Sequence, residues 1–402
     1  MRPTAARAAA LLLVACGLVA CGGERAPRSE DAASSTSGSP SSAPPGTGAP
    51  PESPPAGPEE LVDAALARLD RRAQVAQLFV VGVPANGLDG GAALVEQSVG
   101  GVFLAGRPTG SISELAALTA GWQEDAGGPG LWIAADQEGG QVQGLQGAGF
   151  DRIPPATEQG DLPAPQLAEL AGRLGEQLRS AGVNLDLAPV VDVVPPGTEA
   201  TNGPIGVHDR QYGGTAAEVV PAATAIVEGL ADADVTAALK HFPGLGRVRG
   251  NTDDAADVVD PETADSDEQV TAFADTLTAT AAARPMVMMS SATYPRIDAT
   301  APAVFSAPVI RDLLRGRLGY AGPVISDDVG NATAVAAVPV GDRAVRFLAA
   351  GGTLVLTLAP TTFPDMLDAV LARDAADPAF TATVDAAVRT ALLAKAEAGL
   401  LG

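Results

Sequence analysis

The sequence contains few of the side chains on which most active sites and covalent cross-links are built. Among its 402 residues are two cysteines, two histidines and two lysines, and aromatic residues account for 3%. Both cysteines lie near the N-terminus, so the rest of the chain has no disulfide framework, no thiol nucleophile and no cysteine metal site. The scarcity of aromatic rings excludes a broad platform for stacking sugars, and any sugar site must therefore be a small polar pocket.

Positive charge is also scarce. The formal net charge is -23, from 25 Lys and Arg against 48 Asp and Glu. This balance argues against a nucleic-acid partner and against electrostatic adhesion to anionic lipid. A metal-dependent hydrolase would have to rely on carboxylate ligands, so we expect no metal and no cofactor. Loss of activity on chelation would revive the metal-dependent alternative.

Residues 1–21 have the pattern of a bacterial lipoprotein signal peptide. Two arginines precede an apolar run of small residues, and Leu18-Val19-Ala20-Cys21 resembles a lipobox, which is cut before a cysteine that carries lipid. The run is too short to indicate a membrane-spanning helix. Lipidation of Cys21 would anchor the protein to the bacterial cell membrane, with its domain outside the cytoplasm. The alternatives are a lipobox ending at Cys16 and an ordinary secretory signal with incidental cysteines.

Residues 22–57 are dominated by Gly, Ser, Pro, Ala and Glu and show no apolar periodicity. Such a segment cannot bury enough apolar surface to offset the entropy of ordering, so we predict a disordered tether. The remainder, residues 58–402, is long enough for one large domain or two ordinary ones.

In residues 58–402, short apolar, β-branched runs alternate with amphipathic segments. The predicted strands are residues 77–83, 101–105, 131–136, 183–193, 236–241, 286–290, 323–326 and 353–358. The predicted helices are residues 113–124, 165–181, 215–231, 267–283, 308–318, 343–350, 363–373 and 379–397. This alternation indicates a parallel α/β fold, and a single (β/α)8 TIM-type barrel is the economical choice. A doubly wound open sheet is the alternative, although no Gly-rich phosphate-binding fingerprint follows a strand.

Polar residues stand at the carboxyl ends of five predicted strands, the face on which barrel active sites are built. Lys240 and His241 are adjacent and end the fifth strand. The other polar residues at this face are Asp136, Asp192, Ser290, Ser291, Asp327 and Asp328, with Asp209, Arg210 and Asp253 in loops. A single aspartate at a strand end is often only a helix cap, an interpretation we favour for Asp192 and consider for Asp328. Neither capping nor a purely structural envelope lipoprotein explains the whole set.

Five segments in order resemble glycoside hydrolase family 3, and within it the single-barrel β-N-acetylglucosaminidase (NagZ-like) branch. These segments are Asp136–Gly140, Leu187–Val193, Ile205–Gly213, Lys240–Gly244 and Val324–Asp328. Each is a weak signal by itself, but the likeness runs in order through most of residues 61–400. The resemblance implies a barrel of the family's N-terminal type over residues 58–402, a retaining glycosidase and a carbohydrate substrate.

The resemblance also assigns roles to single residues. Asp327 would be the nucleophile, because a retaining glycosidase needs one carboxylate to attack the anomeric carbon and a proton donor on the leaving oxygen. The residues that would hold the hydroxyls of the sugar are Asp136, Arg210, Lys240 and His241. We expect the positive groups among them to keep Asp327 ionised. The competing interpretation is that Asp327 caps a helix, with Asp328 as its twin.

The sequence departs from this branch at the proton donor. The Lys-His-Phe-Pro-Gly string is normally followed by His-Gly and then by an Asp-x-His pair that serves as the acid/base. Here Leu245 replaces the first histidine, and the Asp-x-His positions read Asn251-Thr252-Asp253. Gln141 and Gly144 replace two arginines, and Ser291 replaces a histidine of the sixth strand.

Three hypotheses for the missing proton donor remain open. Asp253 could act as a carboxylic acid/base, provided that burial or the charge of Asp327 raises its pKa. Asp254 or His208 could instead reach in from a loop. In the third hypothesis the protein has lost hydrolysis and is a sugar-binding pseudoenzyme lipoprotein. The first hypothesis predicts that Asp253 faces Asp327 across the pocket.

We therefore predict an envelope lipoprotein that acts on β-linked N-acetylglucosamine, in peptidoglycan fragments or related glycans, through a glycosyl-Asp327 intermediate. Phosphate instead of water as the final acceptor remains open, because an acceptor that is already an anion needs little help from a base. We expect a monomer that binds carbohydrate and no nucleic acid.

Overall fold

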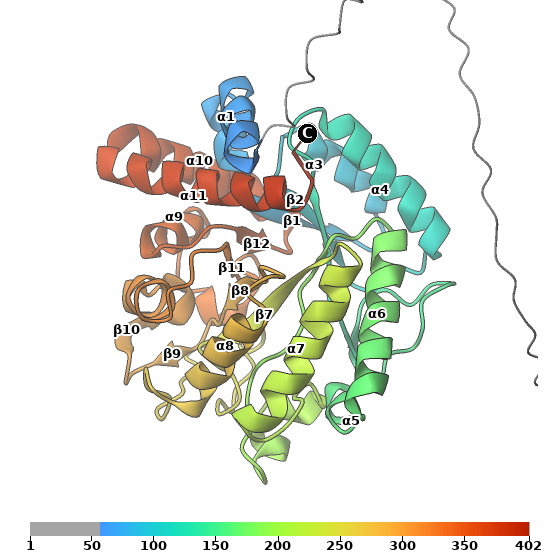
Figure 1. Ribbon diagram of the computed structural model, residues 1–402. Coiled ribbons are helices and arrows are strands. Elements are labelled where there is room, and N and C mark those ends of the chain that lie inside the picture. Colours follow the sequence, from blue (N-terminus) through green and yellow to red (C-terminus); the bar gives the residue numbers. More distant parts are fainter. Residues whose placement is uncertain (1–56, 402) are drawn as a thin grey trace, which may run out of the picture. The chain divides into compact units, whose positions relative to one another are not determined.

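A computed structural model describes residues 57–401, so Cys21, the predicted signal peptide and all but the last residue of the predicted tether lie outside the described residues. Eight parallel strands form the wall of a barrel, in the order β11-β8-β7-β6-β3-β2-β1-β12 (Figure 1). They are β1 (Phe79–Pro84), β2 (Gly101–Ala105), β3 (Trp132–Ala135), β6 (Leu185–Asp186), β7 (Thr236–Phe242), β8 (Met286–Met289), β11 (Val324–Ser326) and β12 (Val355–Thr357). A parallel bridge between Ile325 and Leu354 joins β11 to β12. The predicted (β/α)8 barrel is thereby confirmed, and the open sheet is excluded.

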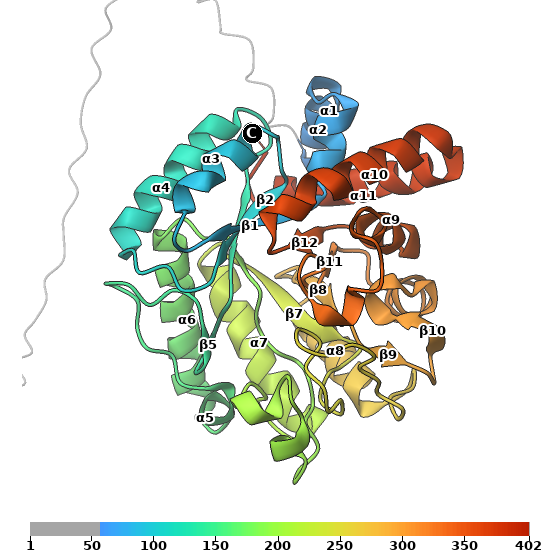
Figure 2. The same ribbon diagram turned by 180° about the vertical axis from the view of Figure 1, so that it is seen from behind.

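Helices surround the barrel, as both views of the ribbon show (Figures 1 and 2). They are α1 (Pro58–Arg68), α2 (Arg71–Ala76), α3 (Gly91–Val95), α4 (Ile112–Ala126), α5 (Ala156–Gly160), α6 (Ala164–Ser180), α7 (Ala216–Asp232), α8 (Glu268–Ala279), α9 (Val340–Ala350), α10 (Phe363–Ala376) and α11 (Pro378–Glu397). The segment predicted as a helix at 308–318 is a wide π-type helix, η5 (Pro308–Arg317). The apolar pattern did not predict α1, α2, α3 or α5, of which the last three have six residues or fewer.

Helix starts follow local chemistry. At α4, Ser111 accepts a hydrogen bond from the backbone N–H of Glu114, whose carboxylate accepts one from the N–H of Ser111. At α8, Asp267 accepts from the N–H of Gln269. Such caps bind N–H groups that have no partner within the helix, so these ends are set by the local sequence.

The fourth strand is shorter than predicted. Residues 183–193 read as one apolar run, but the regular strand β6 covers only Leu185–Asp186. Beyond it, a single bridge from Val190 to Lys240 rejoins the ladder. Pro189 has no N–H to donate to a ladder, which explains the interruption.

Two small antiparallel hairpins stand outside the barrel wall. The first pairs β4 (Gln137–Gly139) with β5 (Val142–Gln143) directly after β3, and the second pairs β9 (Thr293–Tyr294) with β10 (Asp298–Pro302). The first hairpin lies at the carboxyl end of the barrel and forms part of the site described below.

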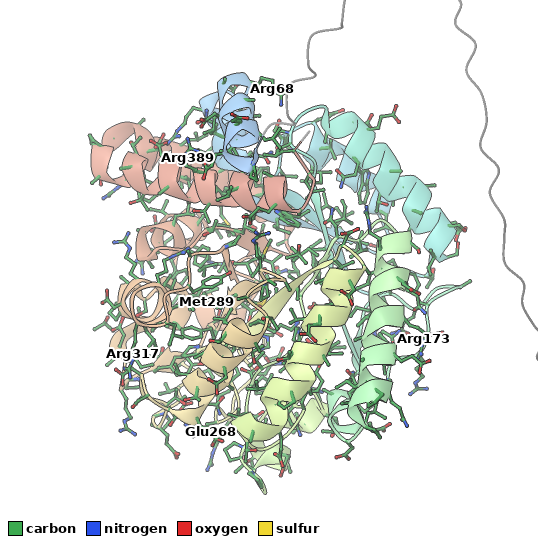
Figure 3. All side chains as sticks on the ribbon, in the orientation of Figure 1. Arg68, Arg173, Glu268, Met289, Arg317 and Arg389 are labelled. Atoms are coloured by element: carbon green, nitrogen blue, oxygen red, sulfur yellow. The ribbon has the colours of Figure 1, made fainter. Side chains whose placement is uncertain are left out.

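Most buried side chains are apolar, apart from the charged groups described below, and most other charged side chains lie on the outside. Met289 lies among the strands in Figure 3, whereas Arg389 lies on the outer face of α11. Arg389 forms ion pairs with Glu59 and Asp63 of α1, so the two ends of the described chain pack together. Within residues 57–401, no helix combines the length and the apolarity needed to cross a bilayer.

Candidate active site

A cavity of about 340 Å³ opens at the carboxyl ends of the strands. All six residues predicted to bind or transform the substrate line it, namely Asp136, Arg210, Lys240, His241, Asp253 and Asp327. They come from the ends of β3, β7 and β11 and from two loops, so the barrel brings together residues that span much of the sequence. Apolar side chains, including those of Leu187 and Met288, form part of the wall.

A network of alternating charges forms one side of this cavity. The Lys240 ammonium nitrogen lies 2.7 Å from Asp136 Oδ1 and 2.6 Å from Glu138 Oε1. Arg210 donates to both oxygens of Glu138, at 2.8 and 2.7 Å, and to the carbonyl of Pro204. Because the network engages the charged groups from several sides, it presents them to the cavity in one orientation.

The two cations determine the charge state of Glu138. Burial by itself would raise the pKa of this carboxyl, but the charges of Arg210 and Lys240 lower it to about 2. In the other direction, the carboxylates of Asp136 and Glu138 outweigh the effect of burial and raise the pKa of Lys240. Glu138 and Lys240 are therefore both ionised at neutral pH.

Sequence reasoning gave no role to Glu138, although its position contained the signal. Asp136 and Glu138 are two residues apart where the chain leaves β3 and enters β4, and alternate residues of an extended segment share a face. Both carboxylates contact the same lysine.

Asp192 is the partner of His241, and the helix-cap interpretation was wrong. Its Oδ2 lies 2.7 Å from His241 Nδ1, and its Oδ1 accepts hydrogen bonds from the backbone N–H groups of His241 and Leu245. The carboxyl is fully buried. With Nδ1 directed at Asp192, Nε2 of His241 remains for a hydrogen bond in the cavity.

Lys240 and His241 both face the cavity although they are neighbours in β7. Between Leu239 and Phe242 the strand contains one residue more than its partner β8, which is a β-bulge. A bulge redirects side chains that would otherwise alternate between the two faces of the sheet. The peptide bond between the two residues is cis.

Two glycines after the pair allow the chain to turn tightly. Gly244 has φ +137°, and a Cβ there would lie 2.3 Å from Gln269 Oε1. A Cβ on Gly246 would lie 1.8 Å from the carbonyl oxygen of Val193. Only glycine fits both positions, which explains why the Phe-Pro-Gly-Leu-Gly segment contains two glycines.

The adjacent aspartates after β11 differ in their hydrogen bonds. Asp328 is buried, and its carboxylate accepts from the backbone N–H groups of Gly330, Asn331 and Leu358. In the described part of the chain, the Asp327 carboxylate accepts one hydrogen bond, from the N–H of Asp328 through Oδ1. Asp328 therefore holds the turn at residues 329–331 and the end of β12 and caps no helix, whereas Asp327 retains an oxygen for chemistry.

The positive groups that were predicted to keep Asp327 ionised bind other carboxylates. Among residues 57–401, no ion pair or hydrogen bond connects Asp327 to Lys240, Arg210 or His241. The lysine and the arginine are neutralised by Asp136 and Glu138 instead.

Asp253 lies in the loop after β7 and shares the cavity with Asp327. The residue is exposed to solvent, and its side chain forms part of the cavity lining. Partial burial and the negative charge of Asp327 raise the pKa of Asp253 to about 6, against the opposing charges of His241 and Arg210. This is the direction that a proton donor near neutral pH requires.

The other two candidate donors do not line the cavity. Asp254 is exposed, and its carboxylate accepts a weak hydrogen bond from the Asn251 side chain at 3.4 Å. His208, in the turn η3 (Gly206–His208), has Nδ1 3.3 Å from Gln141 Oε1 on the rim. Asp253 is therefore the best-placed of the three.

At the other positions where the sequence departs from the family pattern, the replacing residues are apolar, unpaired or without a side chain. Leu245 is buried in the cavity wall, where an imidazole was expected by resemblance. Ser291 is buried, and its hydroxyl has no hydrogen-bond partner within residues 57–401. Gly144 lies close to the backbone of Asp136, so that a Cβ there would be 3.2 Å from its carbonyl oxygen.

A further buried acid, Asp186, lies in β6 close to this charge network. Its Oδ1 accepts from the N–H of Gln137, and burial raises its pKa to about 8. Sequence reasoning missed it because it was read as part of an apolar run. Across residues 57–401, no group of three His, Cys, Asp or Glu residues is arranged to hold a metal ion.

A parallel barrel with a polar pit of carboxylates, cations and one imidazole at its carboxyl face defines a carbohydrate-active enzyme of the TIM-barrel class. The sequence matches the glycosyl hydrolase family 3 N-terminal domain over residues 71–390. The chain belongs to this family, as the resemblance indicated, and is a glycosidase.

Individual relatives agree with the family match. A β-hexosaminidase from Xylella fastidiosa is 37% identical over 289 residues, covering 70% of this chain and 82% of that relative. The structure of a β-N-acetylhexosaminidase from Beutenbergia cavernae is 43% identical, with a TM-score of 0.77, over 82% of this chain and 99% of that one. LpqI of M. tuberculosis is 29% identical, with a TM-score of 0.72, over 86% of this chain and 97% of that one.

Proposed function

We propose that this protein is a retaining β-N-acetylhexosaminidase that acts on β-linked N-acetylglucosamine. The observation that carries the proposal is the shared cavity of Asp327, whose carboxylate has an uncommitted oxygen, and Asp253, whose pKa is raised to about 6. The relatives named as β-hexosaminidases support the substrate class.

In the first step, the Asp327 carboxylate attacks the anomeric carbon of the bound sugar while Asp253 gives its proton to the leaving oxygen. The bond from the sugar to the leaving group breaks as the bond to Asp327 forms. Lys240, Asp136 and Arg210 hold the sugar hydroxyls through hydrogen bonds to charged groups.

In the second step, Asp253 takes a proton from water, and the resulting hydroxide displaces Asp327 from the anomeric carbon. The configuration is therefore inverted twice and retained overall. If phosphate takes the place of water, no proton need be removed, and the product is a sugar phosphate. Product analysis with and without phosphate separates the two outcomes.

We also propose that Cys21 is lipidated and that the domain is held outside the cytoplasm at the cell membrane. There it would act on fragments of peptidoglycan or related glycans. The lipobox and the Gly/Ser/Pro-rich segment of the sequence support this proposal. Metabolic labelling with a clickable fatty acid would test it, since Cys21→Ser should lose the label and Cys16→Ser should retain it.

The central experiment compares wild type, Asp327→Ala and the neighbouring control Asp254→Ala on aryl β-N-acetylglucosaminide and aryl β-glucoside. We expect turnover of the first substrate only, and a loss of at least about a thousand-fold in Asp327→Ala but not in the control. Saturable sugar binding without turnover of aryl or natural substrates would instead favour the sugar-binding pseudoenzyme.

A further inference from the structure

The β11–α9 loop, residues 327–339, carries the proposed nucleophile and also contacts the loop of the proposed proton donor. The backbone N–H groups of Thr333 and Ala334 donate to two carbonyls of the loop after β7, one of them that of Asp253. In the described part of the chain, no hydrogen bond joins the carboxyl groups of Asp253 and Asp327 directly. The separation of the two carboxyl groups therefore depends on how the β11–α9 loop is held.

Arg343, near the N-terminus of α9, binds both ends of the β11–α9 loop. Its Nε donates to the carbonyl of Val338 at 2.9 Å, and its Nη1 donates to the carbonyls of Val329 and Gly330 at 2.7 and 2.8 Å. The residue is only 6% exposed. Because the guanidinium is planar and its donors have fixed directions, one side chain sets the distance between the start and the end of the loop.

Asp328 holds the start of the same loop through other backbone groups. Its carboxylate accepts hydrogen bonds from the N–H groups of Gly330 and Asn331, whereas Arg343 binds carbonyl oxygens there. Donors and acceptors of one turn are thus both engaged, directly after Asp327. Asn331 in this turn lines the catalytic cavity. The turn therefore connects Arg343 to the cavity, although Arg343 itself does not line it.

The position of Arg343 is unfavourable for a cation. The dipole of a helix disfavours positive charge at its N-terminus, and a buried charge usually has a partner of opposite sign. Among residues 57–401, no carboxylate forms an ion pair with Arg343, whose hydrogen bonds go to backbone carbonyls. Burial lowers the pKa of Arg343, against the opposing charge of Asp328. The contacts of Arg343 therefore point to the geometry of the loop and not to a favourable charge pair.

We propose that Arg343 is a positioning residue, which sets the separation of Asp253 and Asp327 by joining the two ends of the β11–α9 loop. The inference rests on the proposed function, because it concerns the two carboxyl groups that were given roles there. A misplacement of about 1 Å between catalytic groups can lower a rate about 10²-fold.

The first test compares R343K and R343A with the control R346A, which removes an exposed arginine from the same helix. On alkyl β-N-acetylglucosaminides, kcat should fall about ten- to hundred-fold in R343K and R343A, while KM changes by less than about three-fold. Aryl substrates with an activated phenolate should lose less, because their leaving group needs no proton from Asp253. Free guanidinium, well below denaturing concentrations, should partly restore R343A, whereas ammonium should not.

The pH profile distinguishes a change in position from the loss of a charge. Burial and the charge of Asp327 raise the pKa of Asp253 to about 6, and the other charged groups that act on it are His241, Arg210 and Asp328. A greater distance from Asp327 would lower this pKa toward 3.8. R343K keeps the positive charge, so its alkaline limb on alkyl glycosides should move to lower pH. Loss of a positive charge alone would move the limb to higher pH.

Hydrogen exchange followed by mass spectrometry tests the inference without turnover. In R343K and R343A, peptides that cover residues 250–256 and 329–338 should exchange faster than in wild type, and in R346A at the wild-type rate. Unchanged exchange in both loops, equal losses on alkyl and aryl substrates, or an unmoved alkaline limb in R343K would overturn the proposal. Failure of the wild type on the aryl substrate would overturn the hydrolase instead, while the exchange comparison would still test whether Arg343 holds the two loops together.

Discussion

Asp327 and Asp328 are identical in chemistry and adjacent in sequence, yet their surroundings give them different tasks. Three backbone N–H groups bind the carboxylate of Asp328, which holds the loop after β11 against β12. Asp327 keeps one oxygen uncommitted and lies beside Asp253, whose pKa it raises. At the scale of single residues, hydrogen bonds decide which carboxylate is structural and which can react.

Replacement of Asp253 should slow turnover most for substrates whose leaving group needs a proton. Asp253→Asn should retain turnover of aryl substrates with an activated phenolate, but should slow alkyl glycosides about 10²–10⁴-fold. In the wild type, the rate on alkyl glycosides should fall as the pH rises through about 6, where Asp253 loses its proton. The variant should lack this limb of the profile, and Asp254→Asn should keep it. A limb unchanged in Asp253→Asn would point to another donor.

The buried carboxylate of Glu138 should contribute to stability. Glu138→Gln leaves Arg210 and Lys240 with one carboxylate fewer, which should lower the free energy of unfolding by about 3–5 kcal/mol at pH 7. The folded-state pKa of about 2 lies below the ordinary 4.5, so the contribution is present above pH 4.5 and is lost as the pH falls toward 2.

Urea unfolding at pH 7 and at pH 3 measures this effect, and the difference between wild type and Glu138→Gln should narrow at pH 3. The control is Glu169→Gln on α6, which breaks an exposed pair with Arg173 and should change stability by less than about 1 kcal/mol. Equal effects of the two substitutions would contradict a buried network.

At the scale of elements, the loops of the carboxyl face are tied to one another. The Thr333 N–H donates to the carbonyl of Asp253 and the Ala334 N–H to that of Thr252, which joins the loop of Asp253 to the segment that follows Asp327. The buried amide of Asn202 joins Gly206, in the loop that carries Arg210, to Leu245 in the segment after β7. Catalytic groups on separate loops thereby keep a common frame.

Asn202→Ala should loosen this frame. It removes two hydrogen bonds to the carbonyls of Leu245 and Val248 and two from the N–H groups of Ile205 and Gly206, all buried. We expect a loss of at least about 2 kcal/mol in unfolding free energy, and a larger fall in kcat than rise in KM.

The matched control is Asn86→Ala, because Asn86 is exposed and does not line the catalytic cavity. It should leave both stability and kinetics near wild type. A fall in stability without a change in kcat would show that Asn202 does not position the catalytic loops.

At the scale of the whole molecule, the last helix, α11, packs against the barrel. It buries a side chain that can carry a charge. Lys395 of α11 is fully buried, and within residues 57–401 its ammonium group donates a single hydrogen bond, to the side chain of Gln77 before β1. Burial lowers the pKa of Lys395 to about 7. Between pH 7 and its ordinary value of 10.5, the unfolded chain binds more protons, so this residue costs stability as the pH falls through that range.

Lys395→Met should therefore stabilise the protein by about 1–3 kcal/mol at pH 7 and flatten the pH dependence of stability between 7 and 10. Thermal or urea unfolding at several pH values measures both. The exposed Arg389→Met on the same helix should change stability by less than about 1 kcal/mol at each pH. If the unfolding free energy of Lys395→Met depended on pH as steeply as that of wild type, another group would be responsible for the dependence.

The sequence by itself determined the eight-stranded α/β alternation, the ring of polar strand ends and the two aspartates proposed for catalysis. The alternation and the polar strand ends depend on apolar periodicity and residue type, both of which are local, whereas the two aspartates were found through the resemblance to family 3. It did not separate Asp192, a partner of His241, from a helix cap, and it gave no role to Glu138 or Asp186. Only the tertiary structure decided those roles, because pairing and burial depend on which distant segments the barrel brings together.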